Sequence, residues 1–196
     1  MTRGLFVCTL GTSRSRIWPS GALMKFWNVL AIFALSSAAF AQNPPVDSPL
    51  LDHLAGKWVA QVSIARHARI DDIDAEWVLA HHYLRLHEIS REKDARGNPH
   101  YEATIFIGER ASTKQISCLW LDVFGGTDIR SIGVAQPKEN EIPFIFKDES
   151  GAIDFSNDFI YDPKADTWEW RLDNVEHGKL IPFGTEKLVR AQAEKK

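Results

Sequence analysis

The sequence has little cysteine, and this shortage excludes a scaffold held together by internal disulfides. It contains two cysteines, Cys8 and Cys118, and Cys8 lies in an N-terminal stretch that we expect to be removed. Cys118 alone cannot form an internal disulfide, even in an oxidising compartment. Because the residue directly after the expected cleavage site is Gln42 and not a cysteine, a lipid anchor is also disfavoured. The stability of the mature chain must therefore come from a hydrophobic core.

Long apolar runs and an excess of positive charge are also missing. The apolar stretch at residues 26–35 is shorter than the roughly 20 residues that a transmembrane helix needs, so no such segment is expected in the mature chain. Removing residues 1–41 takes away four basic residues and no acidic ones, which leaves 19 basic against 26 acidic residues and a net charge of −7. An acidic domain is poorly suited to nucleic acid or an anionic membrane surface, and neither is expected as a partner.

The N-terminal region resembles an export signal. Residues 24–41 read MKFWNVLAIFALSSAAFA, with one charge at Lys25, an apolar centre and a small-residue cleavage site before Gln42. We therefore expect export to the periplasm or the extracellular space. Residues 1–23 are interpreted as an upstream extension of the reading frame, with Met24 as the start. The alternative is that Met1 is the start and the segment is a long n-region or an Arg-rich transit peptide.

The remaining 155 residues are enough for one domain with a sizeable core. We expect a Pro-rich leader at 42–49, a domain at 50–191 and a frayed tail at 192–196. Strand-like runs separated by turn signals follow one another with no long helical pattern between them. The expected strands are 57–67, 75–89, 100–107, 115–123, 128–135, 141–147, 153–161, 167–175 and 179–189. This spacing predicts an all-β fold, an antiparallel barrel of about nine to ten strands.

Alternation of apolar and polar residues predicts which face of each strand is buried. In DTWEWRLD, Trp168, Trp170 and Leu172 share one face, and the charged residues share the other. A second apolar row contains Phe144 and Phe146. A third runs from Ile153 through Phe155 to Phe159 and is interrupted by Asn157. The interior is therefore expected to be rich in aromatic rings.

The run AEWVLAHHYLRLHEIS contains three histidines, His81, His82 and His87. In an extended strand His81 and His87 are about 20 Å apart, and neighbouring residues point to opposite faces, so one metal ion cannot bind them all. No metal site is predicted. One alternative is that these are polar positions on an exposed strand. The other is that His81, with Tyr83 and Arg85, faces the barrel interior and binds the polar end of a ligand.

A resemblance to the calycin superfamily rests on GKW at residues 56–58 and on Arg190 in the last strand. In that superfamily a G-x-W motif places its tryptophan at the closed end of a barrel, under a basic side chain from the last strand. The chain is also similar to small secreted bacterial lipocalin-like domains of unknown function, through GKWVAQV, HYEATIFIG, LWLDVFGG and YDPKADTWEWRL. The resemblance implies an antiparallel barrel with an internal pocket, and it implies no activity.

Other chemical motifs are weak. Among related barrels, haem is held by a histidine near the C-terminal strands, and the candidate here is His177, whose EHGK context predicts an exposed hairpin turn. No cofactor is predicted. The DVFGG segment at 122–126 lacks nucleotide-binding spacing and is interpreted as a turn. Cys118 is expected to be a buried, inert thiol.

The sequence therefore predicts an exported, non-enzymatic barrel that binds a small apolar or amphipathic molecule. The expected ligand-binding residues are Trp58, His81, Tyr83, Arg85, Phe144, Phe146, Phe155, Asn157, Trp168 and Trp170. A barrel filled by these rings, with no ligand, is the competing interpretation. Two other functions stay open. One is a barrel enzyme in which His81 or His87 meets Asp122 or Glu102, and the other is an envelope interaction module.

Overall fold

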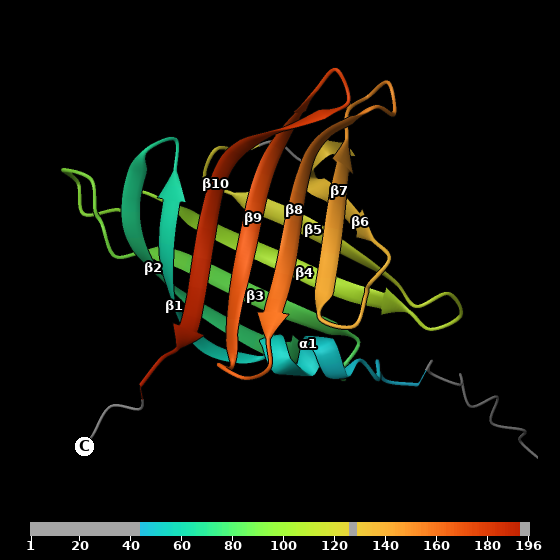
Figure 1. The fold of residues 1–196 in the computed structure, drawn as a ribbon. Coiled ribbons are helices and arrows are strands. Elements are labelled where there is room, and N and C mark those ends of the chain that lie inside the picture. The colour runs from blue at the N-terminus through green and yellow to red at the C-terminus, as the bar shows by residue number, and fades with distance from the viewer. Residues whose placement is uncertain (1–43, 126–128, 193–196) are drawn as a thin grey trace, which may run out of the picture. The chain divides into compact units, whose positions relative to one another are not determined.

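The computed structural model describes residues 44–125 and 129–192, and these form a closed barrel of ten antiparallel strands with one short α-helix (Figure 1). The expected upstream extension and signal peptide lie outside the described residues, as does most of the tail. The elements are α1 (Pro49–Leu54), β1 (Gly56–Ile64), β2 (His67–Val78), β3 (Tyr83–Ser90), β4 (Glu102–Arg110), β5 (Gln115–Asp122), a 3₁₀ turn η1 (Ile129–Ser131), β6 (Ile132–Ala135), β7 (Glu141–Lys147), β8 (Ile153–Asp162), β9 (Thr167–Glu176) and β10 (Lys179–Arg190).

Each strand pairs with the next strand in sequence, and β10 closes the sheet by pairing with β1. In this last pair Trp58 lies opposite Arg190 and Ile64 lies opposite Gly184. Closure joins the two edges that an open sheet would leave unpaired. The all-β class and the expected barrel of about nine to ten strands are confirmed.

Three of the expected strand runs are wrong. The run 128–135 is a strand only from Ile132 onward, because Ile129–Ser131 form η1. The run 57–67 ends earlier, at Ile64, and the run 75–89 is divided between the end of β2, a turn and most of β3. The turns between these strands use residues with positive φ angles that are not glycine, namely Ala65 and Arg66, then Leu79, Ala80 and His81. Since the sequence has no Gly, Pro or Asn at these turns, its pattern gives no turn signal.

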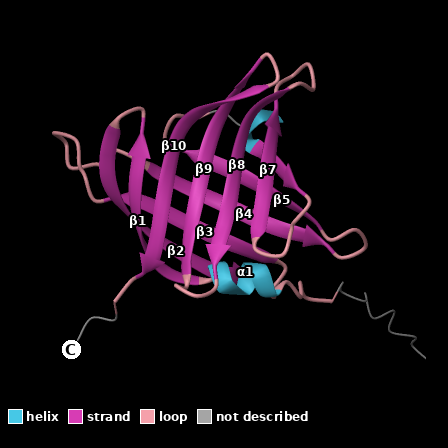
Figure 2. Ribbon diagram, in the orientation of Figure 1, coloured by secondary structure: helices cyan, strands magenta, loops and turns pink. Residues whose placement is uncertain are grey.

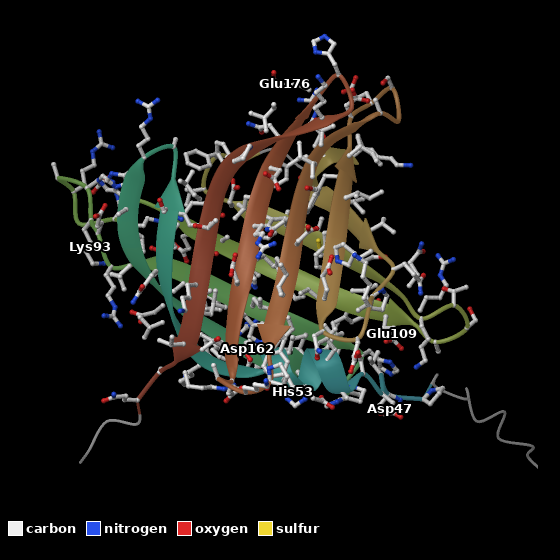
Figure 3. All side chains as sticks on the ribbon, viewed as in Figure 1. Asp47, His53, Lys93, Glu109, Asp162 and Glu176 are labelled. Carbon is white, nitrogen blue, oxygen red and sulfur yellow. The ribbon has the colours of Figure 1, made fainter. Side chains whose placement is uncertain are left out.

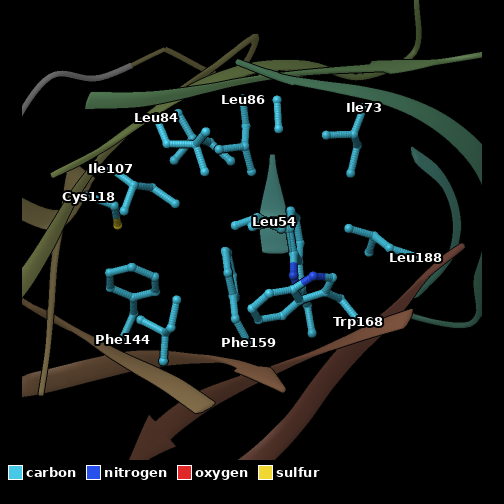
Figure 4. Close-up of a cluster of buried hydrophobic side chains, with 14 of the residues drawn as sticks. Leu54, Ile73, Leu84, Leu86, Ile107, Cys118, Phe144, Phe159, Trp168 and Leu188 are labelled. Atoms are coloured by element: carbon cyan, nitrogen blue, oxygen red, sulfur yellow. The ribbon is translucent and has the colours of Figure 1, made fainter. Parts of the chain in front are cut away.

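The interior is packed with the alternating residues of all the long strands. Figure 4 shows Leu84, Leu86 and Ile73 on one wall facing Phe144, Phe159 and Trp168 on the other, and all six side chains are buried. Trp168, Trp170 and Leu172 share the inner face of β9, as the alternation predicted. Leu54 enters this core from α1, which lies across one end of the barrel (Figure 2).

Candidate ligand-binding chamber

The barrel end covered by α1 is closed by a stack of Trp58 and Arg190. The Arg190 guanidinium carbon lies 3.7 Å from the Trp58 ring centroid, and Trp58 donates from Nε1 to the Leu54 carbonyl oxygen at 2.7 Å. Arg190 also donates to the Ala55 carbonyl and pairs with Asp166 at 2.9 Å. The predicted stack is therefore confirmed, and Figure 3 shows His53 and Asp162 at this same end.

Gly56 explains why the motif begins with glycine. Its φ angle is +124°, which side-chain-bearing residues rarely adopt, and a Cβ atom there would lie 2.6 Å from Arg190 Nη1. The absence of a side chain lets the guanidinium cover the neighbouring Trp58 ring. This end of the barrel is closed as the resemblance implies.

The middle of the barrel is a filled core. The rings of Phe159 and Trp170 stack with centroids 4.1 Å apart, and Phe144 meets Phe159 edge-on at 5.2 Å. Trp168 is fully buried, with its Nε1 3.5 Å from the His53 carbonyl oxygen of α1. Trp58, Phe144, Trp168 and Trp170 thus pack mainly against other core residues. They do not line the chamber described next.

The opposite end of the barrel contains a chamber of about 630 Å³. Six aromatic residues line it: Tyr101, Trp120, Phe124, Phe146, Phe155 and Phe183. Phe183 is the extra residue of a β-bulge between Pro182 and Gly184, and its ring meets Phe155 with centroids 6.1 Å apart. His67, His100 and Arg130 also line the chamber. Of the predicted ligand-binding residues, Phe146, Phe155 and Asn157 are brought together here.

His81, Tyr83 and Arg85 do not face the interior. His81 lies in the β2–β3 turn and stacks on Trp77, with centroids 4.0 Å apart. The inner face of β3 belongs to Leu84, Leu86 and Glu88, which places Tyr83 and Arg85 on the outer face. The expectation that these three residues hold a ligand inside the barrel is therefore wrong. Its cause is the unrecognised turn, which sets the register of β3.

Three further residues considered in the sequence analysis, His87, His177 and Cys118, lie away from the chamber. His87 Nε2 lies 2.8 Å from Glu102 Oε1, so the predicted histidine–carboxylate contact exists, but both side chains are on the outer face of the barrel. His177 is exposed in the β9–β10 turn, as expected. Cys118 is buried, and burial raises the pKa of its thiol to about 12. This thiol is therefore a poor nucleophile.

Glu186, which lines the chamber, belongs to a buried acid cluster with Asp71 and Glu88, and the three residues come from three different strands. Arg69 donates from Nε to both Asp71 carboxylate oxygens, at 3.1 and 2.7 Å, and its Nη2 lies 3.7 Å from Glu88 Oε1. The guanidinium also lies over the Tyr101 ring, 4.6 Å from its centroid. Within the described part of the chain, Arg69 is the one cation found in contact with this cluster.

Burial determines the ionisation of two of these carboxyl groups. It raises the pKa of Glu186 to about 8, although the nearby Arg69 charge opposes the shift. It also raises the pKa of Glu88 well above its usual range, and the neighbouring Glu186 and Asp71 add to this effect. Near neutral pH both carboxyls therefore tend to keep their protons.

Three side chains in the chamber wall have buried polar atoms without a hydrogen-bond partner among the described residues: Asn157, Glu186 and Arg69, in which the atom is Nη2. Asn157 is 1% exposed, and among the described residues neither its amide nitrogen nor its amide oxygen has a hydrogen-bond partner. Glu186 is 2% exposed, and its Oε2 likewise has no partner there. A buried polar group without a partner lowers the free energy of unfolding by about 1–3 kcal/mol. Such groups are rare in folded proteins, and a polar position of this kind in a cavity wall indicates a contact made by a ligand.

The sequence pattern predicted only one of the polar residues in and next to the chamber. It singled out Asn157, because this residue interrupts an apolar row, but it did not single out Arg69, Glu88 or Glu186. It also did not identify Trp120 as a lining residue. The same signal was present for two of them: Glu88 follows Leu84 and Leu86 at period two, and Glu186 precedes Leu188. An acidic residue on the apolar face of a strand predicts a polar position inside the barrel.

Glu186 is expected to make the barrel less stable as the pH rises. Its pKa is 4.5 when unperturbed and about 8 in the folded chain, so between these values the folded state binds more protons than the unfolded state. The free energy of unfolding should then fall by roughly 1.4 kcal/mol per pH unit from this group, and Glu88 acts in the same direction. Urea denaturation between pH 5 and 8 measures the slope.

The variant Glu186→Gln should have a shallower slope, and Glu169→Gln, on the outer face of β9, should leave the slope unchanged. An identical slope in the wild type and in Glu186→Gln would contradict the assignment.

Comparison of the sequence with protein-family models and with curated proteins finds no match. In the described ranges no group of three or more His, Cys, Asp or Glu side chains is arranged to hold a metal ion. No helix in those ranges is long and apolar enough to cross a membrane. The geometry of the chamber is therefore the main indication of function.

Proposed function

We propose that this protein binds a small amphipathic molecule in the chamber, without chemical conversion. The observation that carries the proposal is the chamber itself: about 630 Å³, lined by six aromatic residues and by the unpartnered polar atoms of Asn157 and Glu186. Ligand sites in proteins are typically concave, mostly apolar and supplied with a few fixed polar groups. The chamber has each of these properties.

The aromatic lining provides the binding energy, and the polar groups provide orientation. Burying about 300 Å² of apolar ligand surface gains roughly 7 kcal/mol before the cost of association. After that cost the apolar contacts alone support weak binding. A polar anchor at Asn157 or Glu186 is therefore needed for micromolar affinity.

The resemblance to calycins and the N-terminal signal extend this proposal. The closed end formed by Trp58 and Arg190 and the opposite chamber support a calycin-like binding barrel. The segment 24–41 supports action outside the cytoplasm, in the periplasm or beyond. In that setting a barrel with one closed end is suited to carrying a molecule that dissolves poorly in water.

Tryptophan fluorescence tests the proposal because Trp120 lines the chamber. The purified protein is first weighed by native mass spectrometry for a co-purified adduct, and then titrated with fatty acids, isoprenoids and haem. We expect at least one class to change the fluorescence, and we expect Trp120→Phe to remove most of that change. Trp77→Phe, near the closed end, should retain it.

A mass without adduct and no fluorescence response to any class would refute the proposal.

The same native mass spectra report self-association. This matters because Phe106, Leu119 and Ile132 form an apolar row across the outer faces of β4, β5 and β6. This row favours an interaction module as the second candidate function.

A further inference from the structure

The acid cluster raises a question about the polar end of the ligand. Three buried carboxyl groups share the charge of a single guanidinium, that of Arg69, which donates two hydrogen bonds to Asp71 and lies 3.7 Å from Glu88. Glu88 and Glu186 are thus left without a cation of their own. A buried carboxylate is stable only when it is paired with a cation or hydrogen-bonded.

Asn157 supplies a second, independent observation. It is on β8, separated from Glu186 on β10 only by β9, and both residues line the chamber. Its buried amide has no hydrogen-bond partner among the described residues, and neither has Glu186 Oε2. Each residue offers an oxygen acceptor to the same chamber, and a group with several N–H donors can use both.

The aromatic rings around these acceptors indicate which kind of polar group the ligand carries. Trp120, Phe146 and Phe155 line the same chamber, and aromatic faces attract cations through their quadrupoles. A buried carboxyl group ionises more readily beside a cation, so Glu186 suits an ammonium group better than a neutral hydroxyl. A ligand carboxylate supplies no such cation, and it repels Glu186 once Glu186 ionises.

From this geometry we infer that the chamber binds a cationic amphiphile whose protonated amine lies against Glu186, with the Asn157 side-chain oxygen as a further acceptor and its apolar part among the rings. This inference rests on the proposed function and deepens it. It assigns the class of ligand and the residue that selects it.

Binding of an ammonium group should release a proton. The pKa of Glu186, raised to about 8 by burial, keeps its carboxyl largely protonated at pH 7, and a cation beside it favours the ionised form. The ionisable groups that face Glu186 are Arg69 and Asp71 on β2, Glu88 on β3, and Tyr101. Of these, Arg69 opposes a second cation, but the Asp71 carboxylate that accepts its two hydrogen bonds offsets its charge. His67, His100 and Arg130 also line the chamber.

The test compares three probes with the same chain: decylamine, decan-1-ol and decanoate. Isothermal titration calorimetry of the purified protein at pH 7 is expected to give decylamine at least about tenfold higher affinity than either other probe, a difference of one decade in Kd. Repeating the titration in buffers of different ionisation enthalpy should show close to one proton released per amine. In the unmodified protein, amine affinity should rise between pH 6 and 8, and alcohol affinity should not.

Two variants test which residues bind the ammonium group. Glu186→Gln should lower decylamine affinity by about tenfold, abolish proton release and leave decan-1-ol binding unchanged. Asn157→Leu should weaken the amine several-fold and keep the proton release. Glu169→Gln, which removes a carboxylate from the outer face of the same barrel, serves as the matched control and should change nothing.

The outcomes separate this inference from the proposed function. If all three probes bind equally well, or decanoate binds best, the assignment of an amine is overturned and the chamber is still a binding site. If Glu186→Gln binds decylamine like the wild type, Glu186 is not the anchor. If no probe binds, the inference fails, and the fluorescence titration with the wider panel decides the proposed function by itself.

Discussion

Replacing Trp58 with alanine is expected to lower the free energy of unfolding by about 3–5 kcal/mol, because a fully buried aromatic side chain leaves a cavity at the closed end. The variant also loses the hydrogen bond to the Leu54 carbonyl and the surface that Arg190 covers. Because α1 contacts the barrel through these groups, its docking should weaken as well. Urea denaturation followed by circular dichroism measures the loss.

A double-mutant cycle tests whether the Trp58–Arg190 stack itself stabilises the barrel. Arg190→Ala alone should cost less than Trp58→Ala, since Arg190 is partly exposed. The coupling energy between the two changes should be about 1 kcal/mol, in the range of a partly desolvated cation–π pair. Arg171→Ala, on the outer face of β9, serves as the control partner and should show no coupling. Strict additivity of Trp58→Ala and Arg190→Ala would show that the stack contributes nothing beyond its separate contacts.

Replacing Arg69 with methionine is the second change with a large expected effect. It leaves Asp71, which is fully buried, without the guanidinium that neutralises it, and breaking a buried ion pair on one side costs about 3–5 kcal/mol. Methionine retains much of the apolar stem, so lost packing is a minor part of the effect. The same denaturation measurement reports it.

The neighbouring residue of β2 supplies a matched control. Asp72 forms a two-hydrogen-bond pair with Arg91, at 2.9 and 2.6 Å, but both side chains are about half exposed. Arg91→Met should therefore cost less than about 1 kcal/mol. The double variant Arg69→Met with Asp71→Asn should recover part of the loss, because no buried charge is left unpaired. An Arg69→Met protein as stable as the Arg91→Met protein would mean that water reaches Asp71.

The closed end was the part of the site easiest to predict from the sequence. The glycine and tryptophan of GKW are two residues apart, and Arg190 ends the last strand, so pairing of the first and last strands brings them together. The chamber was harder to predict. Its acid cluster combines residues from β2, β3 and β10, and no local spacing relates Asp71 to Glu186.

The error at His81, Tyr83 and Arg85 has a specific physical cause. A shift of one residue in register moves every side chain of a strand to the other face. The β2–β3 turn, built from Leu79, Ala80 and His81 without a glycine, sets this register, and local sequence pattern does not reveal such a turn. The polar residues of β3 therefore lie outside, and Glu88 lies inside with the leucines.

The sequence by itself determined the all-β class, the approximate number of strands and the aromatic faces of β7, β8 and β9, because the period-two pattern is a local property of each strand. The resemblance of GKW and Arg190 to the calycin pattern also implied the Trp58–Arg190 stack, which the structure contains. The tertiary structure alone decided that the rings fill one part of the barrel and line a chamber in another. It alone brought Glu186, Asn157 and Arg69 to that chamber, because their proximity depends on strand register and barrel closure, which bring Arg69 close to residues more than 80 positions away in the sequence.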